Sequence, residues 1–154
     1  MYKRQLESLL ARHPQTKVIW CHLGQVRYPQ RTRRYGPQYV KSLIERFPNL
    51  YFDLGLSGPP HVDPASGAHD MMIYEFTGRG RWGGNLRKDW QQLFEDSPAR
   101  FLAASDIGGD RFRQFPSQIQ RLRELVLDEL SARARHQIAY QNAWQLIAGE
   151  PWSN

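Results

Sequence analysis

The spacing of hydrophobic residues divides the chain into alternating helices and strands. Apolar side chains recur at helical spacing over residues 4–12, 39–47 and 116–133, with a short helix at 89–94 and a final helix through 138–147. His13-Pro14 and Pro48 follow the first two helical segments, where a proline ends a helix. We expect Leu6, Leu9 and Leu10 to share one buried face, and Ile119, Leu122, Val126 and Leu130 to share another.

Three other segments have nearly continuous apolar runs, which are typical of parallel strands covered on both faces. They are Lys17–Leu23, Asn49–Leu56 and Arg100–Gly108. The second and third are separated by residues 57–88, a segment rich in glycine and proline that we expect to be an irregular, functional or mobile loop. Strands alternating with helices predict an α/β chain whose strands pair in parallel through right-handed crossovers.

Length and composition favour a single soluble domain. The chain has 154 residues, of which 40% are hydrophobic, enough for a core. It contains no apolar run long enough for a bilayer, and its opening, MYKRQLESLL, lacks a signal-peptide pattern. Its single cysteine, Cys21, is expected to be a small buried hydrophobe within the first strand. We therefore expect a cytoplasmic protein with no membrane partner.

The charge permits an anionic partner without requiring one. The net charge is +6, from 21 Lys and Arg against 15 Asp and Glu, and most of the cations are arginines. The segment RYPQRTRRYGPQY, residues 27–39, interleaves arginines with tyrosines, and GRGRWGG, Gly78 to Gly84, is faintly similar to an RGG segment. Both patterns suit single-stranded nucleic acid. They also suit a solvated loop or a clamp on a substrate carboxylate, and we favour these over nucleic acid.

Each predicted strand carries, at or near its end, a side chain that can take part in acid–base or metal chemistry. The first ends on His22, the second holds Asp53 near its end, and the third ends on Ser105-Asp106. Parallel α/β folds gather active groups at the carboxyl ends of their strands, so we expect His22 and Asp106 to lie together. A histidine that caps a turn and an aspartate that caps a helix are the structural alternatives. Asp53 suits fixing a loop as well as touching substrate.

Four motifs occur in a fixed order along residues 5 to 148. They are HPQTKVIWCHLG, LIERFPNLYFDLG, RFLAASDIGGD and IAYQNAWQLIA. As an ordered set they resemble the C-terminal half of the amidohydrolase-related, metal-dependent hydrolases, including their decarboxylase-like branch. That resemblance implies a (β/α)8 barrel, here represented by about its last three βα units and a C-terminal helical pair, with one divalent metal, often zinc, at the mouth of the barrel.

The same resemblance implies roles for two residues. Asp106 would be a metal ligand and proton acceptor, and His22 would be the catalytic histidine beside the metal. The function implied is hydrolysis of a small, probably anionic organic substrate by metal-activated water. Amide, ester, lactone and carbon–carbon bond cleavages all occur on this scaffold.

The sequence also departs from the family pattern. The N-terminal H-x-H motif and the mid-barrel histidine are absent. His13 and His136 are expected at the surface, and His61 and His69 in the long loop. We therefore expect a truncated or mis-started reading frame, in preference to a fragment completed by another chain that supplies the missing N-terminal half or to a decayed homologue. We also expect weak zinc binding and poor turnover by this chain alone. An interaction module that pairs its open sheet edge in a homo-oligomer is a further alternative.

Overall fold

The computed structural model of the chain describes residues 2–24, 36–55, 61–62, 69–70, 73–76 and 84–153. Its central feature is a parallel sheet of three strands, β1 (Val18–Trp20), β2 (Leu50–Asp53) and β7 (Phe101–Leu102), in the order β1-β2-β7. Trp20 pairs with Phe52, and Phe52 pairs with Phe101, both in parallel. All three strands therefore run in the same direction, and their carboxyl ends lie at one edge of the sheet, which we call the rim. The predicted α/β class with parallel strands is confirmed.

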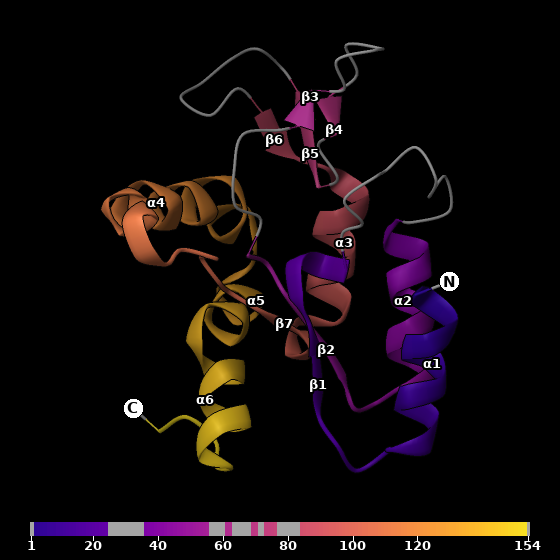
Figure 1. The fold of residues 1–154 in the computed structure, drawn as a ribbon. Helices are drawn as coiled ribbons and strands as arrows, with labels where there is room; N and C mark the ends of the chain where they lie inside the picture. The colour runs from indigo at the N-terminus through magenta and orange to yellow at the C-terminus, as the bar shows by residue number, and fades with distance from the viewer. Residues whose placement is uncertain are drawn as a thin grey trace.

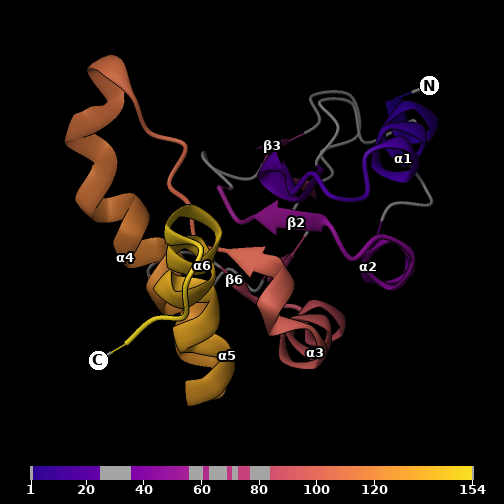
Figure 2. The ribbon, with the colours of Figure 1, turned by 90° about the horizontal axis from the view of Figure 1, so that it is seen from below.

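Helices connect and cover these strands. They are α1 (Tyr2–Arg12), α2 (Pro37–Arg46), α3 (Lys88–Asp96), α4 (Phe115–Leu125), α5 (Ala132–His136) and α6 (Asn142–Ala148), the last two joined by one π-helical turn at Gln137–Gln141. In Figures 1 and 2 the sheet lies between α1 and α2 on one side and α4 on the other. Pro37 begins α2, where the missing N–H costs nothing.

Aromatic rings fill the space between the sheet and α3. Phe52 and Phe101 are fully buried with ring centroids 5.9 Å apart, and Phe94 meets Phe101 edge to face at 4.8 Å. Trp90 is also fully buried. The other face of β1 is open, since Ile19 is 45% exposed.

Two buried asparagines tie the ends of elements together. The side-chain amide of Asn49 donates to the carbonyls of His13 and Thr16, each at 3.0 Å, which joins the turn after α1 to the start of β2. The amide of Asn142 donates to the carbonyls of Pro98 and Phe101, each at 2.8 Å, which joins α6 to β7. Both residues belong to the motifs that carry the family resemblance, and in this structure both are packing residues.

Several predicted boundaries were wrong. All three parallel strands are shorter than expected: the chain enters a 3-10 turn after Trp20, and the backbone N–H of Ala103, which follows β7, donates to the carbonyl of Ile138 at 2.8 Å. Residues 57–88 are not wholly irregular: β3 (His61–Val62) pairs with β4 (His69–Asp70), and β5 (Tyr74–Phe76) pairs with β6 (Gly84–Leu86). In Figure 1 these hairpins lie above the parallel sheet, beyond the carboxyl end of β2.

The predicted helix over 116–133 is interrupted. It ends at Leu125, and a short 3-10 turn (Leu127–Glu129) precedes α5. This bend lets both Val126 and Leu130 enter the core, whereas Ile119 is 39% exposed instead of sharing their face. In α1, Leu10 is buried but Leu9 is 41% exposed, so only part of the predicted apolar face is covered.

Candidate active site at the strand ends

The chain turns sharply where β1 ends. Trp20 is the last strand residue, and Cys21–Gly24 form a 3-10 turn in place of the predicted strand through Leu23. His22, Leu23 and Gly24 all have left-handed backbone, with φ of 57°, 53° and 64°. A side chain on Gly24 would lie 2.7 Å from the Trp20 ring, so glycine is required there. Leu23 is fully buried and anchors the turn, which directs the neighbouring His22 side chain toward the rim.

Asp53, at the end of β2, holds this turn in place. Its Oδ1 accepts a hydrogen bond from the backbone N–H of His22 at 2.7 Å and another from the N–H of Gly55 at 3.0 Å. Left-handed backbone costs non-glycine residues free energy, and these bonds to a carboxylate compensate for it. Of the two roles left open for Asp53, the structure shows loop fixing.

The imidazole of His22 has a defined orientation. Its Nδ1 lies 2.5 Å from the carbonyl oxygen of Gly55. Because a carbonyl oxygen only accepts, Nδ1 carries the proton of the neutral ring and Nε2 carries the lone pair. This is the arrangement in which a histidine accepts a proton or binds a metal through Nε2.

Asp106 lies opposite that nitrogen. Its Oδ1 is 3.8 Å from His22 Nε2, and its Oδ2 is 4.0 Å from the guanidinium of Arg111. Both members of the His22–Asp106 pair are 40% exposed, so the pair is open to a small solute. The prediction that these two residues meet at one rim is confirmed. Asp106 is itself left-handed, with φ of 48°, which marks a strained position at the site.

Gly55 allows the close approach of the strand ends. A Cβ there would lie 3.1 Å from Asp53 Oδ1, 3.4 Å from the Ala104 Cβ and 3.5 Å from the Asp106 Cβ. The segment after β2 therefore touches the segment after β7 directly. This contact sets the distance between the His22 ring, held by Gly55, and the Asp106 carboxylate.

Cys21 differs from its prediction. It is exposed, not buried within a strand, because β1 has already ended. A hydrogen bond to Asp53 raises the pKa of its thiol, and desolvation and the negative charges of Asp53 and Asp106 raise it further. The thiol is therefore a poor nucleophile near neutral pH.

The donor atoms at the rim fit one side of a divalent metal site. An imidazole nitrogen and a carboxylate oxygen are both ligands that zinc accepts. Within the described ranges, however, no group of three or more His, Cys, Asp or Glu side chains is arranged to hold a metal. His13 and His136 are exposed, as expected. The side chains of His61 and His69, and the segment 27–35, lie outside the described residues.

Some residues that shape the site were not singled out from the sequence. Arg111 lies in a 3-10 turn (Gly109–Gln114) whose sequence, GDRFRQ, gives no sign of facing Asp106. Gly55 has a weak signal in the YFDLG motif, since a glycine after a strand permits close packing. The position of Asp53 near the end of a predicted strand places it at the rim. Nothing in the sequence indicates that its carboxylate accepts hydrogen bonds from the backbone N–H groups of His22 and Gly55.

In the part of the chain that the structure describes, none of the helices combines the length and the apolar character needed to cross a membrane. Comparisons with protein-family models, with curated proteins and with solved structures find no match to this chain.

Proposed function

We propose that this chain carries the proton-handling side of a metal-dependent hydrolase that acts on a small, anionic organic substrate. The observation that carries the proposal is the 3.8 Å separation between His22 Nε2 and Asp106 Oδ1 at the carboxyl ends of parallel strands. The family resemblance of the four motifs assigns the same two residues independently of that distance.

The roles of the two residues follow from their contacts. In its neutral form, His22 donates Nδ1–H to Gly55 and so presents the Nε2 lone pair toward the open rim. It can take a proton from a water or a substrate hydroxyl placed at the pair, and can return it to a leaving group. Asp106 stabilises the imidazolium that forms, because a carboxylate near a cation lowers its free energy.

A divalent cation is part of the proposal. Asp106 would hold it, with His22 beside it, and such a cation would polarise a substrate carbonyl and acidify a water. Arg111 faces the other carboxylate oxygen of Asp106. A cation at Asp106 must work against this guanidinium, which is one reason to expect weak metal binding.

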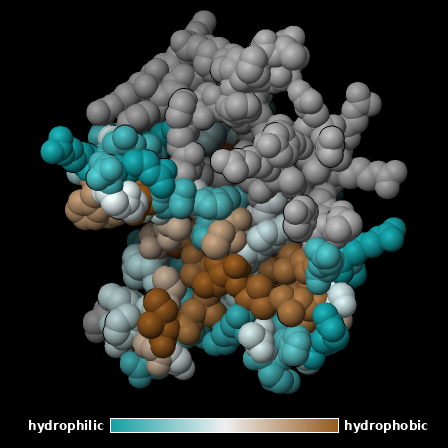
Figure 3. Space-filling model, viewed as in Figure 1, coloured by the Kyte–Doolittle hydropathy of each residue, from teal (hydrophilic) through white to brown (hydrophobic). Residues whose placement is uncertain are grey.

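We also propose that β1, β2 and β7 are the last three strands of a (β/α)8 barrel. β1 and β2 are each followed by a helix-containing crossover to the next parallel strand, and β7 is followed by helices, as in such a barrel. Within the described residues, β1 has a strand on one side only. Figure 3 shows apolar residues gathered over the region of β1 and β2, and the side chain of Ile19 in β1 is 45% exposed. Barrel strands beside β1 would cover it.

Calorimetric titration with Zn²⁺ tests the enzyme proposal. The full chain should bind zinc with a Kd weaker than about 1 μM, and His22→Gln and Asp106→Asn should each remove this binding. Asp110→Asn, an exposed aspartate in the next turn, serves as the control and should bind as the parent does. Binding that survives Asp106→Asn, or submicromolar binding by the parent chain, would refute the proposed half-site.

A homo-oligomeric interaction module is the second candidate, favoured by the open edge of β1. Light scattering over a range of concentrations distinguishes it from an enzyme fragment. A dimer that persists at high dilution and dissociates in Ile19→Lys supports edge or face pairing between copies. A monomer at all concentrations removes this candidate.

A further inference from the structure

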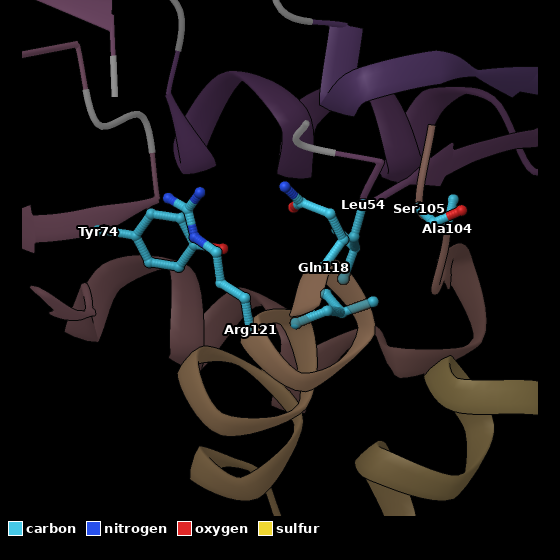
Figure 4. A pocket seen from close by; sticks show the side chains of 7 residues that line it. Leu54, Tyr74, Ala104, Ser105, Gln118 and Arg121 are labelled. Atoms are coloured by element: carbon cyan, nitrogen blue, oxygen red, sulfur yellow. The ribbon is translucent and has the colours of Figure 1, made fainter. Parts of the chain in front are cut away.

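A second group of polar side chains lies next to the His22–Asp106 pair. Residues from β5, from α4 and from the segments after β2 and β7 line a small pocket that is open to solvent and has a cavity volume of about 10 Å³. That is room for about one water-sized group, so the pocket suits a single oxygen atom or the small polar end of a ligand whose remainder lies outside it. Figure 4 shows the side chains that line it.

The pocket is lined by both apolar and polar side chains. Leu54 and Leu122 supply apolar surface, and Ser105, Gln118 and Arg121 supply hydrogen-bonding groups. In Figure 4 the Gln118 amide lies between the Arg121 guanidinium and Ser105. An arginine, an amide and a hydroxyl are the donors that recognise a carboxylate or another small oxyanion.

Arg121 is oriented by Tyr74. Its guanidinium carbon lies 5.8 Å from the centroid of the Tyr74 ring, which restricts its movement and favours its charge. Burial raises the pKa of Tyr74 to about 12. The phenol therefore stays neutral near neutral pH and does not replace an anionic ligand at Arg121.

The pocket and the His22–Asp106 pair share two segments of chain. Leu54 lines the pocket, and the next residue, Gly55, holds the His22 ring. Ser105 lines the pocket, and the next residue, Asp106, faces the ring. Consecutive Cα atoms are about 3.8 Å apart, so the pocket adjoins the pair along both segments of chain.

We propose that this Arg121–Gln118 pocket binds a carboxylate of the substrate and thereby positions the scissile bond at the His22–Asp106 pair. The inference rests on the proposed function and deepens it: the substrate class becomes small organic acids whose carboxylate is a few atoms from the bond that is broken. Gln118 and Arg121 are then binding residues on α4 that set specificity.

The test is a titration of the full chain, without metal, with succinate and with its neutral analogue succinamide. Binding is followed by the NMR signals of the Gln118 side-chain amide and the Ser105 backbone amide. Succinate should shift both signals, and succinamide should not. Arg121→Gln should weaken succinate binding by about tenfold or more, because a charge-assisted bond to the anion is lost.

Matched variants keep the outcome interpretable. Arg123→Gln removes a 72% exposed arginine from the same helix and should leave succinate binding unchanged. Gln118→Leu preserves Arg121 and its stacking on Tyr74 and should still weaken binding, so a folding defect in Arg121→Gln does not decide the test. Equal binding of succinate to the parent, Arg121→Gln and Gln118→Leu, or no succinate binding at all, would overturn the proposal.

The two proposals fail separately. Asp106→Asn should abolish zinc binding yet leave the succinate shifts at Gln118 and Ser105 in place. If succinate binds but zinc binding does not depend on Asp106, the anion pocket is retained and the hydrolase site is rejected. Zinc binding that depends on Asp106 without succinate binding would do the reverse.

Discussion

Replacing Asp53 should release the turn that carries His22. Oδ1 of Asp53 accepts hydrogen bonds from the backbone N–H groups of His22 and Gly55, at 2.7 and 3.0 Å. Asp53→Ala deletes both acceptor contacts, whereas Asp53→Asn keeps an oxygen of the same shape and loses only the charge. The two variants therefore separate the geometry of the acceptor from its charge.

The magnitude follows from the backbone. His22 and Leu23 have φ of 57° and 53°, and left-handed backbone costs about 1–2 kcal/mol for each non-glycine residue. Hydrogen bonds to a charged acceptor contribute about 1.5–3 kcal/mol each, with the lower end appropriate to a half-buried carboxylate. Two bonds at that lower end roughly offset the strain. We expect Asp53→Ala to lower the free energy of unfolding by about 3 kcal/mol, and Asp53→Asn by about 1 kcal/mol.

Urea denaturation followed by tryptophan fluorescence measures both values. Asp110→Ala, which removes an exposed aspartate, is the control and should change stability by less than about 0.5 kcal/mol. A change for Asp53→Ala no larger than that of the control would show that Asp53 does not support the turn. The account of how His22 reaches the rim would then be wrong.

Three further predictions concern Asp106, Asn142 and Cys21. Asp106→Gly should leave the free energy of unfolding unchanged or raise it by about 1 kcal/mol, since glycine accepts a φ of 48° without strain; a loss above about 1 kcal/mol in urea denaturation would argue against strain at this site. Asn142→Ala should cost about 2–3 kcal/mol, because the carbonyls of Pro98 and Phe101 lose buried donors, and a thermal melt equal to that of the parent would contradict this. Cys21 should react with iodoacetamide with a pH midpoint that is higher in the parent than in Asp53→Asn, because the Asp53 carboxylate raises the pKa of the thiol; identical midpoints would show that the two side chains do not interact.

The parallel core could be predicted from the sequence because its pattern is redundant. Alternation of apolar runs with helical spacing specifies parallel strands joined by helices, and the positions of His22, Asp53 and Asp106 near the strand ends then place them at one rim. The contact between His22 and Asp106 is a consequence of topology. It needs no knowledge of individual side-chain conformations.

The local conformation of the site could not be predicted in the same way. An apolar pattern continues through Cys21 and Leu23, but the chain leaves the sheet after Trp20, because Leu23 packs into the core from a left-handed turn. Tertiary contacts with Asp53 and Gly55 decide that turn, and both lie about thirty residues away in the sequence. The strands of the short hairpins within 57–88 have only two or three residues each, too few for an alternation that signals a strand.

The central claim is that His22 and Asp106 act as one site, and an NMR titration of the histidine rings with Zn²⁺ tests it most directly. The account predicts that, in the absence of metal, His22 carries its proton on Nδ1, and that added zinc shifts the Nε2 resonance of His22 in the parent chain but far less in Asp106→Asn. A zinc response confined to the other histidines, or one at His22 that is the same with and without the Asp106 carboxylate, would contradict it.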